Sequence, residues 1–326
     1  MHLKHFILSL LLPAAFAATA QSVQPLPFGN MDNWVTRNIR ESHIIGGKDR
    51  QCFAIGPTRT INGDEPYRNS GGSPWGTSNV MAKVVGITKV SNAVFPDVRG
   101  SGKCAKLTTM LEHCKALGLI NIDVLVAGTI FLGEMQEPIS STSNPYSKMD
   151  MGMPFTQRPT ALVYDYRLTV PEGGTRMYSS GFGKKKTLPG SDKAEVLVYL
   201  QRRWEDADGN IHAKRVGTGR ELLGSSTSGW VNGHKLPIHY GDISGKPYFR
   251  NYMGLIPEAK SYCARNSRGK IVPVVEEGWD DASATPTHIL VMFSAGSGEP
   301  YTGTIGLTFW VDNVGLSYSD RDTAAE

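Results

Sequence analysis

The segment that decides the fold runs from Thr304 to Tyr318 and reads TIGLTFWVDNVGLSY. Its large apolar residues occupy alternate positions, which is the pattern of a β-strand with one buried face. They are Ile305, Leu307, Phe309 and Val311 in the first half, and Val314, Leu316 and Tyr318 in the second. The alternation therefore moves from odd to even positions at Asp312 and Asn313. A slip of one residue would turn the second half inside out unless the backbone bulges, so the sequence predicts a bulged strand.

The predicted bulge places a carboxylate, Asp312, beside a carboxamide, Asn313. Oxygen ligands of this kind suit Ca²⁺ better than Zn²⁺ or Mg²⁺. The first and last strands of a β-sandwich commonly lie side by side, which would bring Asn30 or Asp32 close to Asp312. We therefore consider a structural calcium site that includes Asp312 and Asn30 and fastens the two ends of the domain. The alternative is that Asp312 accepts hydrogen bonds from backbone N–H groups at the bulge.

Short alternating segments recur along the chain, which contains 36 glycines and 19 prolines in 326 residues. Such a pattern, with few stretches of helical period, is typical of an all-β sandwich or barrel. The other candidate strands are 80–90, 103–111, 122–132, 161–170, 195–202, 245–255 and 288–295. Turn signals at 206–210 and 232–233 separate some of them. Gly128, inside one candidate strand, predicts a bulge or a close approach of two backbones.

The N-terminus has the features of a secretory signal covering residues 1–20. A basic start precedes the apolar run from Phe6 to Leu12, and Ala18-Thr19-Ala20 fits a cleavage site. The apolar run is too short to cross ~30 Å of hydrocarbon. We therefore expect an exported protein, in the periplasm, at the cell surface or in the medium, without a transmembrane segment after cleavage. The mature chain is expected to form one domain over residues 26–320, with a loop-rich excursion at about 40–75.

The formal net charge of +4 is small, and the charges are scattered along the chain. This balance gives no reason to expect a nucleic-acid partner. The one basic run, Lys184 to Lys186, lies between a glycine and a proline and is expected in a solvated loop.

Four cysteines follow the signal, and an even number in an exported chain permits two disulfides with three possible connectivities. Cys104 and Cys114 are ten residues apart, on either side of an expected hairpin, and are the pair that we favour. Cys52 would then pair with Cys263. The alternative is buried, reduced thiols. No CxxC spacing is present, so a zinc site is not indicated.

Tryptophans are the natural candidates for a sugar site, because carbohydrate rings stack on flat aromatic side chains while a few polar groups fix their orientation. A tryptophan in a polar loop exposes apolar area unless it packs or binds a ligand. Three tryptophans lie in segments rich in Gly, Ser and Asp and are our carbohydrate-binding candidates: Trp75, Trp230 and Trp279. The alternative is that each fixes its own loop to the domain. Trp34 and Trp310 are expected in the core.

An enzyme that cleaves glycosides needs two carboxyl groups about 5–9.5 Å apart. Acidic residues flank Trp279 at 276–277 and 280–281. Adjacent residues of an extended chain point in opposite directions, so neighbours alone do not form such a pair, and a solvated acidic loop is the simpler interpretation. No serine-nucleophile motif occurs in a strand-to-helix context. The sequence thus identifies no catalytic constellation and leaves enzymatic activity open.

Six motifs occur in series along the mature chain. They are FGNMDNW (28–34), PWGTSN (74–79), AGTIFLG (127–133), GMPFTQRPTAL (152–162), PIHY (237–240) and WVDNVGLSY (310–318). In this order and spacing they resemble the putative carbohydrate metabolism domain family. The resemblance implies a jelly-roll-like β-sandwich, export, and association with the glycan-handling systems of polysaccharide-degrading bacteria. The family's closing strand commonly reads V-D-D-V, whereas this chain has Asn313 at the third position, which removes one negative charge.

We therefore expect an all-β fold, a jelly-roll-like β-sandwich that resembles carbohydrate-binding modules. The expected function is that of an exported glycan-binding accessory protein in polysaccharide capture or utilisation, whose partner is a polysaccharide or oligosaccharide. One alternative is a glycoside hydrolase or lyase on the same scaffold. The other is a structural cell-surface protein or adhesin.

Overall fold

Strand β25 (Thr308–Tyr318), the predicted closing strand, lies inside a large antiparallel sheet in the computed structural model. The structure describes residues 22–69, 72–84, 86–116, 120–140, 144–181, 183–297 and 300–319. The predicted signal sequence lies outside these residues. Within them the secondary structure consists of strands and short 3-10 helices, as expected for an all-β protein.

The first large sheet has seven strands in the order β10-β9-β25-β14-β19, with β1 on β25 and β8 on β9. The bounds are β1 (Ser22–Pro25), β8 (Val94–Arg99), β9 (Gly102–Ala116), β10 (Ile120–Ala127), β14 (Ala161–Thr169) and β19 (Val231–Pro237). The first strand therefore lies beside the last, as expected. β25 pairs with β9 through residues 308–311 and with β1 through residues 315–318. The neighbour of β25 on this side thus changes at Asp312 and Asn313, where the alternation of apolar residues shifts by one position.

The predicted bulge is confirmed. Against β14, Gly315 pairs with Val163 and Asp312 pairs with Asp165, so β25 contains one residue more than its partner in this interval. Asn313 takes up the extra length in a left-handed conformation, with φ of 50°. Because of this insertion, side chains on both sides of the bulge reach the same core.

The second large sheet has ten strands in the order β12-β11-β23-β17-β18-β22-β21, with β5 on β11, β13 on β23 and β20 on β18. Its bounds are β5 (Trp75–Thr77), β11 (Thr129–Met135), β12 (Met149–Met151), β13 (Met153–Pro154), β17 (Ala194–Glu205), β18 (Ile211–Leu223), β20 (His239–Tyr240), β21 (Cys263–Arg265), β22 (Ile271–Trp279) and β23 (His288–Ser294). All pairs are antiparallel except β18 with β22. The hairpin turn predicted at 206–210 joins β17 to β18.

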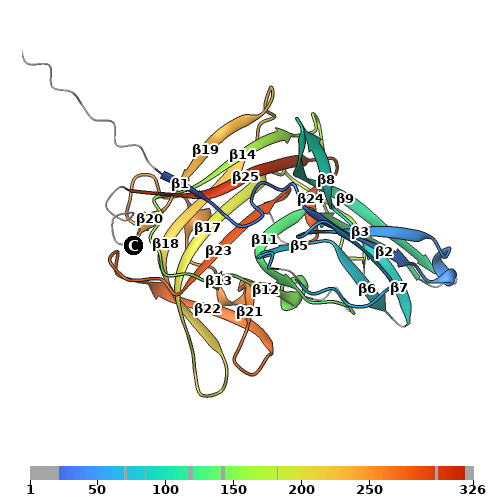
Figure 1. The fold of residues 1–326 in the computed structure, drawn as a ribbon, viewed down its shortest axis with the longest axis horizontal. Coiled ribbons are helices and arrows are strands. Elements are labelled where there is room, and N and C mark those ends of the chain that lie inside the picture. The colour runs from blue at the N-terminus through green and yellow to red at the C-terminus, as the bar shows by residue number, and fades with distance from the viewer. Residues whose placement is uncertain are drawn as a thin grey trace, which may run out of the picture.

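The two sheets pack face to face around one continuous apolar core (Figure 1). Phe309 and Val311 enter it from the seven-stranded sheet, and Val198, Val291 and Phe293 enter it from the ten-stranded sheet. Burying a side chain of this size contributes roughly 1.5–3 kcal/mol, so these inward positions account for much of the stability. The expected β-sandwich is confirmed.

The chain changes sheets at Gly128, so the segment 122–132 is two strands rather than one. β10 ends in the seven-stranded sheet and β11 begins in the ten-stranded sheet. A Cβ on Gly128 would lie 2.2 Å from the carbonyl oxygen of Ala93, which confirms the predicted close approach of two backbones. Glycine is required here because no other residue leaves room for the neighbouring chain.

Three smaller sheets complete the described part of the molecule, and two of them lie together at one end (Figure 1). Their strands are β2 (Trp34–Arg40), β3 (Asp49–Ile55) and β4 (Arg59–Asn62), then β6 (Val80–Val84) and β7 (Ile87–Ser91), and finally β15 (Arg176–Tyr178), β16 (Lys186–Leu188) and β24 (Thr302–Thr304). The excursion expected at 40–75 therefore contains two strands of a small sheet as well as loops. Buried Arg37 fastens this sheet to the body through both Glu137 carboxylate oxygens, at 2.8 Å each.

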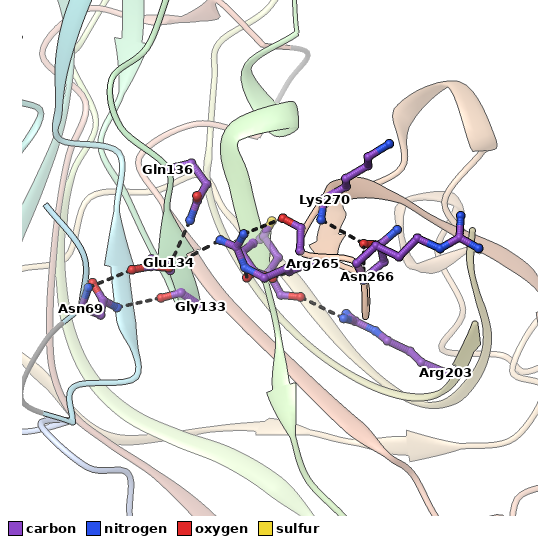
Figure 2. A network of polar contacts seen from close by, with 12 residues as sticks. Asn69, Gly133, Glu134, Gln136, Arg203, Arg265, Asn266 and Lys270 are labelled. Atoms are coloured by element: carbon purple, nitrogen blue, oxygen red, sulfur yellow. Dashed lines mark hydrogen bonds and ion pairs between the residues drawn. The ribbon is translucent and has the colours of Figure 1, made fainter. Parts of the chain in front are cut away.

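The far end of the excursion is held by a second polar network (Figure 2). The Asn69 side chain donates to the carbonyl of Gly133 at 2.9 Å, and its backbone N–H donates to Glu134. Arg265 lies between Glu134 and Asp150, with its Nε 3.1 Å from the Asp150 carboxylate. These carboxylates thus neutralise an arginine and anchor a loop, which is a structural role.

Four 3-10 helices occur among the described residues: η1 (His43–Ile45), η2 (Pro145–Lys148), η3 (Asn251–Met253) and η4 (Glu258–Lys260). The strand expected at 245–255 is wrong, because this segment contains η3 and coil instead. The turn expected at 232–233 is also wrong, because both residues lie inside β19. No helix in the described ranges is long and apolar enough to cross a membrane.

The favoured disulfide pairing is wrong. Cys104 and Cys114 lie on the single strand β9, where ten residues span roughly 33 Å. A disulfide requires Cα atoms within about 7 Å of each other. All four cysteines are free thiols in the described chain, and Cys52 and Cys263 lie in separate sheets.

Candidate functional site

The outer face of the seven-stranded sheet carries a row of alternating tryptophans and cations. Since Phe309 and Val311 point into the core, Trp310 between them points away from it. Trp310 pairs across the sheet with Arg167 of β14 on one side and with Lys106 of β9 on the other. Trp230, directly before β19, continues the row beyond Arg167. We call Trp230, Arg167, Trp310 and Lys106 the tryptophan ladder.

Cations lie against both indole rings of the ladder. The Arg167 guanidinium carbon is 3.9 Å from the centre of the Trp310 ring and 6.0 Å from that of Trp230. Lys106 Nζ is 5.8 Å from the Trp310 ring, and Arg99 lies 3.9 Å from the Trp230 ring. Cation–π contacts of this kind contribute about 0.5–2 kcal/mol each and restrict the long side chains. The ladder therefore presents guanidinium N–H groups held between aromatic rings.

Asp97 of β8 fixes the orientation of the Trp310 indole, whose Nε1 donates to its carboxylate at 2.7 Å. Burial would raise the pKa of the Asp97 carboxyl, but the hydrogen bonds from Trp310 and from the Val98 N–H lower it below its ordinary value overall. Asp97 is thus an ionised acceptor at neutral pH.

Below Trp230, Arg99 joins two carboxylates on neighbouring strands. Its Nη1 lies 2.7 Å from Asp312, and its Nη2 lies 2.8 Å from Asp165 and 2.6 Å from the Asn232 side-chain oxygen. All three charged side chains are largely buried. Such a group is stable only while every charge has a partner, so the Asp165–Arg99–Asp312 triad is a rigid base for Trp230.

Two backbone irregularities meet at Asp165. The Gly233 N–H, at a register shift between β14 and β19, donates to Asp165 Oδ1 at 2.6 Å. The Asn313 carboxamide, at the bulge of β25, donates to Asp165 Oδ2 at 2.8 Å. Asp165 thus holds β19 and β25 in register around the site.

The two carboxyl groups of the triad have opposite pKa shifts. Burial would raise the pKa of Asp165, but the donors Asn313, Gly233 and Arg99 lower it below its ordinary value overall. Burial raises the pKa of Asp312 in spite of its contact with Arg99. The difference follows from the larger number of hydrogen-bond donors around Asp165.

The structure does not bring the three candidate tryptophans together. Trp75 lies in strand β5 instead of a loop, is 0% exposed, and donates from Nε1 to the Pro27 carbonyl at 2.9 Å. The expectation that it offers a ring face to a ligand is therefore wrong. Trp279 ends β22 in the other large sheet, 5.8 Å from the Arg215 guanidinium. Only Trp230 joins other candidate residues.

Each expected calcium ligand binds another protein group. The Asp312 carboxylate binds the Arg99 guanidinium, while the Asn30 side chain donates to Asp32 at 2.9 Å. In the described ranges, no group of three or more His, Cys, Asp or Glu side chains has the arrangement of a metal site. A guanidinium therefore supplies the positive charge that we assigned to a calcium ion at Asp312.

Three of the four acidic residues around Trp279 bind arginine or histidine side chains, and Glu276 and Glu277 lie on strand β22. Glu276 is buried against Arg215, Glu277 is 2.7 Å from His212, and Asp280 is 2.6 Å from Arg202. Each of these three carboxylates is bound to a cationic or imidazole side chain.

Trp310 is the ladder residue that the sequence interpretation assigned to the wrong side. It was expected in the core, yet its even position puts it on the same face as Asp312 and opposite Phe309. The alternation alone could have shown this. The cations Arg99, Arg167 and Lys106 left no local signal, because they meet their partners from segments more than 60 residues away in the chain. Trp34 is buried, as expected.

A second candidate site is a cleft of about 850 Å³ between β15, β16 and the segments around η2 and η4. Three tyrosines line it together with lysines and a glutamate: Tyr146, Tyr178, Tyr301, Lys186, Lys260 and Glu258. Its volume suits a small ligand. It contains none of the carbohydrate-binding or metal-binding candidates of the sequence analysis.

The model of the putative carbohydrate metabolism domain matches residues 59–224, which is half of the chain. This protein belongs to the putative carbohydrate metabolism domain family. The matched region includes Arg99, Lys106, Asp165 and Arg167, whereas Trp230 and Trp310 lie beyond it. The resemblance deduced from the six sequence motifs is confirmed.

Two solved structures match this chain at low identity. A putative glycoside hydrolase from Bacteroides thetaiotaomicron VPI-5482 is 15% identical over 93% of this chain and 95% of its own, with a TM-score of 0.42. A putative glycoside hydrolase from Bacteroides vulgatus ATCC 8482 is 14% identical over 90% and 94%, with a TM-score of 0.40. No curated protein matches the chain.

Proposed function

We propose that this member of the family is an exported accessory protein that binds polysaccharide or oligosaccharide at the tryptophan ladder. Membership of a carbohydrate-related family supports the class of ligand. We propose the ladder as the binding site because two indoles, with a guanidinium between them, lie in a row on an outer sheet face. Export follows from the predicted signal, and a secreted form beginning at Gln21 in the mass spectrum would test it.

The chemistry of the ladder suits sugar recognition. Stacking restricts the Arg167 guanidinium, so a ligand hydroxyl meets a donor whose conformational freedom is already reduced. The indole edges add apolar contact for the C–H groups of a sugar ring. Both carboxylates beneath Trp230 are bound to Arg99, so they are committed to holding the site and are not free to act as acid and nucleophile. This arrangement favours binding over hydrolysis.

The test is affinity electrophoresis and titration calorimetry against a panel of soluble plant, algal and bacterial polysaccharides. We expect Trp230→Ala and Trp310→Ala each to weaken binding about tenfold, which corresponds to about 1.4 kcal/mol. Circular dichroism and the melting temperature establish that each variant is folded.

Two control variants make the test specific. Trp204→Ala removes a tryptophan that is 37% exposed and stacked on His212 in the other large sheet. Tyr178→Ala alters the tyrosine-lined cleft. Both should leave the affinity unchanged. The proposal is wrong if no polysaccharide binds, or if Tyr178→Ala abolishes binding while the ladder variants retain it.

A further inference from the structure

The ladder contains positive charge that the protein itself does not pair. The ladder and the residues that support it include three cations and three carboxylates: Arg99, Lys106 and Arg167, and Asp97, Asp165 and Asp312. Arg99 alone binds two of the carboxylates, Asp165 and Asp312. Only Asp97 remains near Lys106 and Arg167, and its oxygens accept from the Trp310 indole and the Val98 N–H. The triad end of the face is therefore acidic, while the Arg167–Lys106 end has excess positive charge.

Arg167 is the strongest indication of a ligand. Across the described ranges its guanidinium makes no hydrogen bond or ion pair, and its Nε–H is buried without an acceptor. A buried donor without a partner costs about 1–3 kcal/mol. A guanidinium in this state, half-buried between two indoles, is available to an anion whose oxygens accept two hydrogen bonds from it.

Lys106 extends the same end of the face. Its ammonium lies 5.8 Å from the Trp310 ring, on the strand opposite Arg167. Within the described chain it makes no ion pair with a carboxylate at 4 Å or less. Arg167 and Lys106 thus place two unpaired cations on either side of one indole.

Building on the proposed function, we propose that the ladder binds acidic glycans, with Arg167 and Lys106 holding the anionic group of the sugar. The shared chemistry is a negative group on a pyranose ring, either the carboxylate of a uronic acid or a sulfate ester. Both groups accept the paired N–H donors of a guanidinium. The sugar ring itself contacts the indole edges of Trp230 and Trp310.

The experiment compares glycans that differ only in charge. The probes are polygalacturonate with its fully methyl-esterified form, and carrageenan with its desulfated form, titrated at low and physiological salt. We expect at least one charged form to bind about tenfold more tightly than its neutral form. A preference for polygalacturonate identifies the uronate as the ligand group, and a preference for carrageenan identifies the sulfate ester. The preference should shrink as salt rises.

Variants separate this inference from the proposed function. Arg167→Gln keeps a planar group against Trp310 and removes the charge, and Lys106→Gln removes the charge on the other side of the indole. Each should weaken binding of the charged glycan more than binding of its neutral form, and so remove most of the preference. Lys184→Gln removes one exposed positive charge from the segment before β16, outside the ladder, and should alter neither.

Three outcomes are distinguishable. Equal affinity for charged and neutral forms, with Trp310→Ala weakening both, overturns the acidic-glycan inference and leaves the glycan-binding function intact. A charge preference that survives Arg167→Gln and Lys106→Gln also overturns it. Absence of binding to every probe overturns both proposals together.

Discussion

At the scale of single residues, Arg99 determines how the site is held together. One side chain binds Asp165, Asp312 and Asn232 and also stacks on Trp230. A calcium ion would have given a similar electrostatic result at Asp312. A guanidinium adds a flat surface that a metal ion lacks, and this surface positions the indole above it.

Removing the Arg99 charge should destabilise the protein strongly. Arg99→Met leaves Asp165 and Asp312 buried and adjacent on neighbouring strands, so we expect a loss of about 3 kcal/mol in the free energy of unfolding. Urea denaturation measures this loss. The matched control is Arg40→Met, which breaks a well-exposed ion pair with Asp49 and should cost less than about 1 kcal/mol. Equal effects of the two substitutions would contradict the assignment of the triad.

At the scale of secondary-structure elements, β25 joins the site to the fold. Its bulge is the place where the strand exchanges β9 for β1 as neighbour, and the same insertion keeps Val311 and Val314 in one core. Because this insertion keeps the apolar side chains in the core, the polar side chains at the bulge face the outer side of the sheet. There Asn313 contacts Asp165, and Asp312 contacts Arg99.

The bulge should tolerate glycine better than a β-branched residue at position 313. Asn313 has φ of 50°, a conformation that costs a β-branched side chain about 2 kcal/mol. We expect Asn313→Val to lose this amount plus the hydrogen bond to Asp165. Asn313→Gly should lose only about 1 kcal/mol, because glycine adopts the conformation freely. Chemical unfolding of the two variants gives the comparison, and a valine variant as stable as the glycine variant would show that the bulge relaxes.

At the scale of the whole molecule, stability comes from the contact between two large sheets, reinforced by the buried Arg37–Glu137 pair that fastens the excursion. The cysteines take part as packed side chains. Burial raises the pKa of the Cys52 and Cys104 thiols to about 12, which keeps them protonated and unreactive at neutral pH.

The fold should therefore be independent of disulfide bonds. We expect the denatured, unreduced protein to expose four alkylatable thiols by intact mass, and a reducing agent to leave the melting temperature unchanged. Alkylation of fewer than four thiols together with a lower melting temperature after reduction would contradict the structure.

The sequence predicted the secondary-structure elements of this protein better than it predicted which side chains contact each other. It indicated the closing strand, its bulge, the turn at 206–210 and the special position of Gly128, because each depends on residues close together in the chain. It also supplied Trp230 and Asp312, which Arg99 brings to one site. It failed for Trp75, because a glycine- and serine-rich neighbourhood was interpreted as a loop whereas the segment adds an edge strand to the core.

By itself, the sequence determined that the chain is all-β, that its last strand changes phase at Asp312, and that it belongs to a carbohydrate-related family. The period of two is a local property of the extended backbone, so it can be read from neighbouring residues. The tertiary structure alone decided that Arg167, Trp310 and Lys106 form one row. Their strands come from distant parts of the chain, and the register between such strands is set by packing of the shared core.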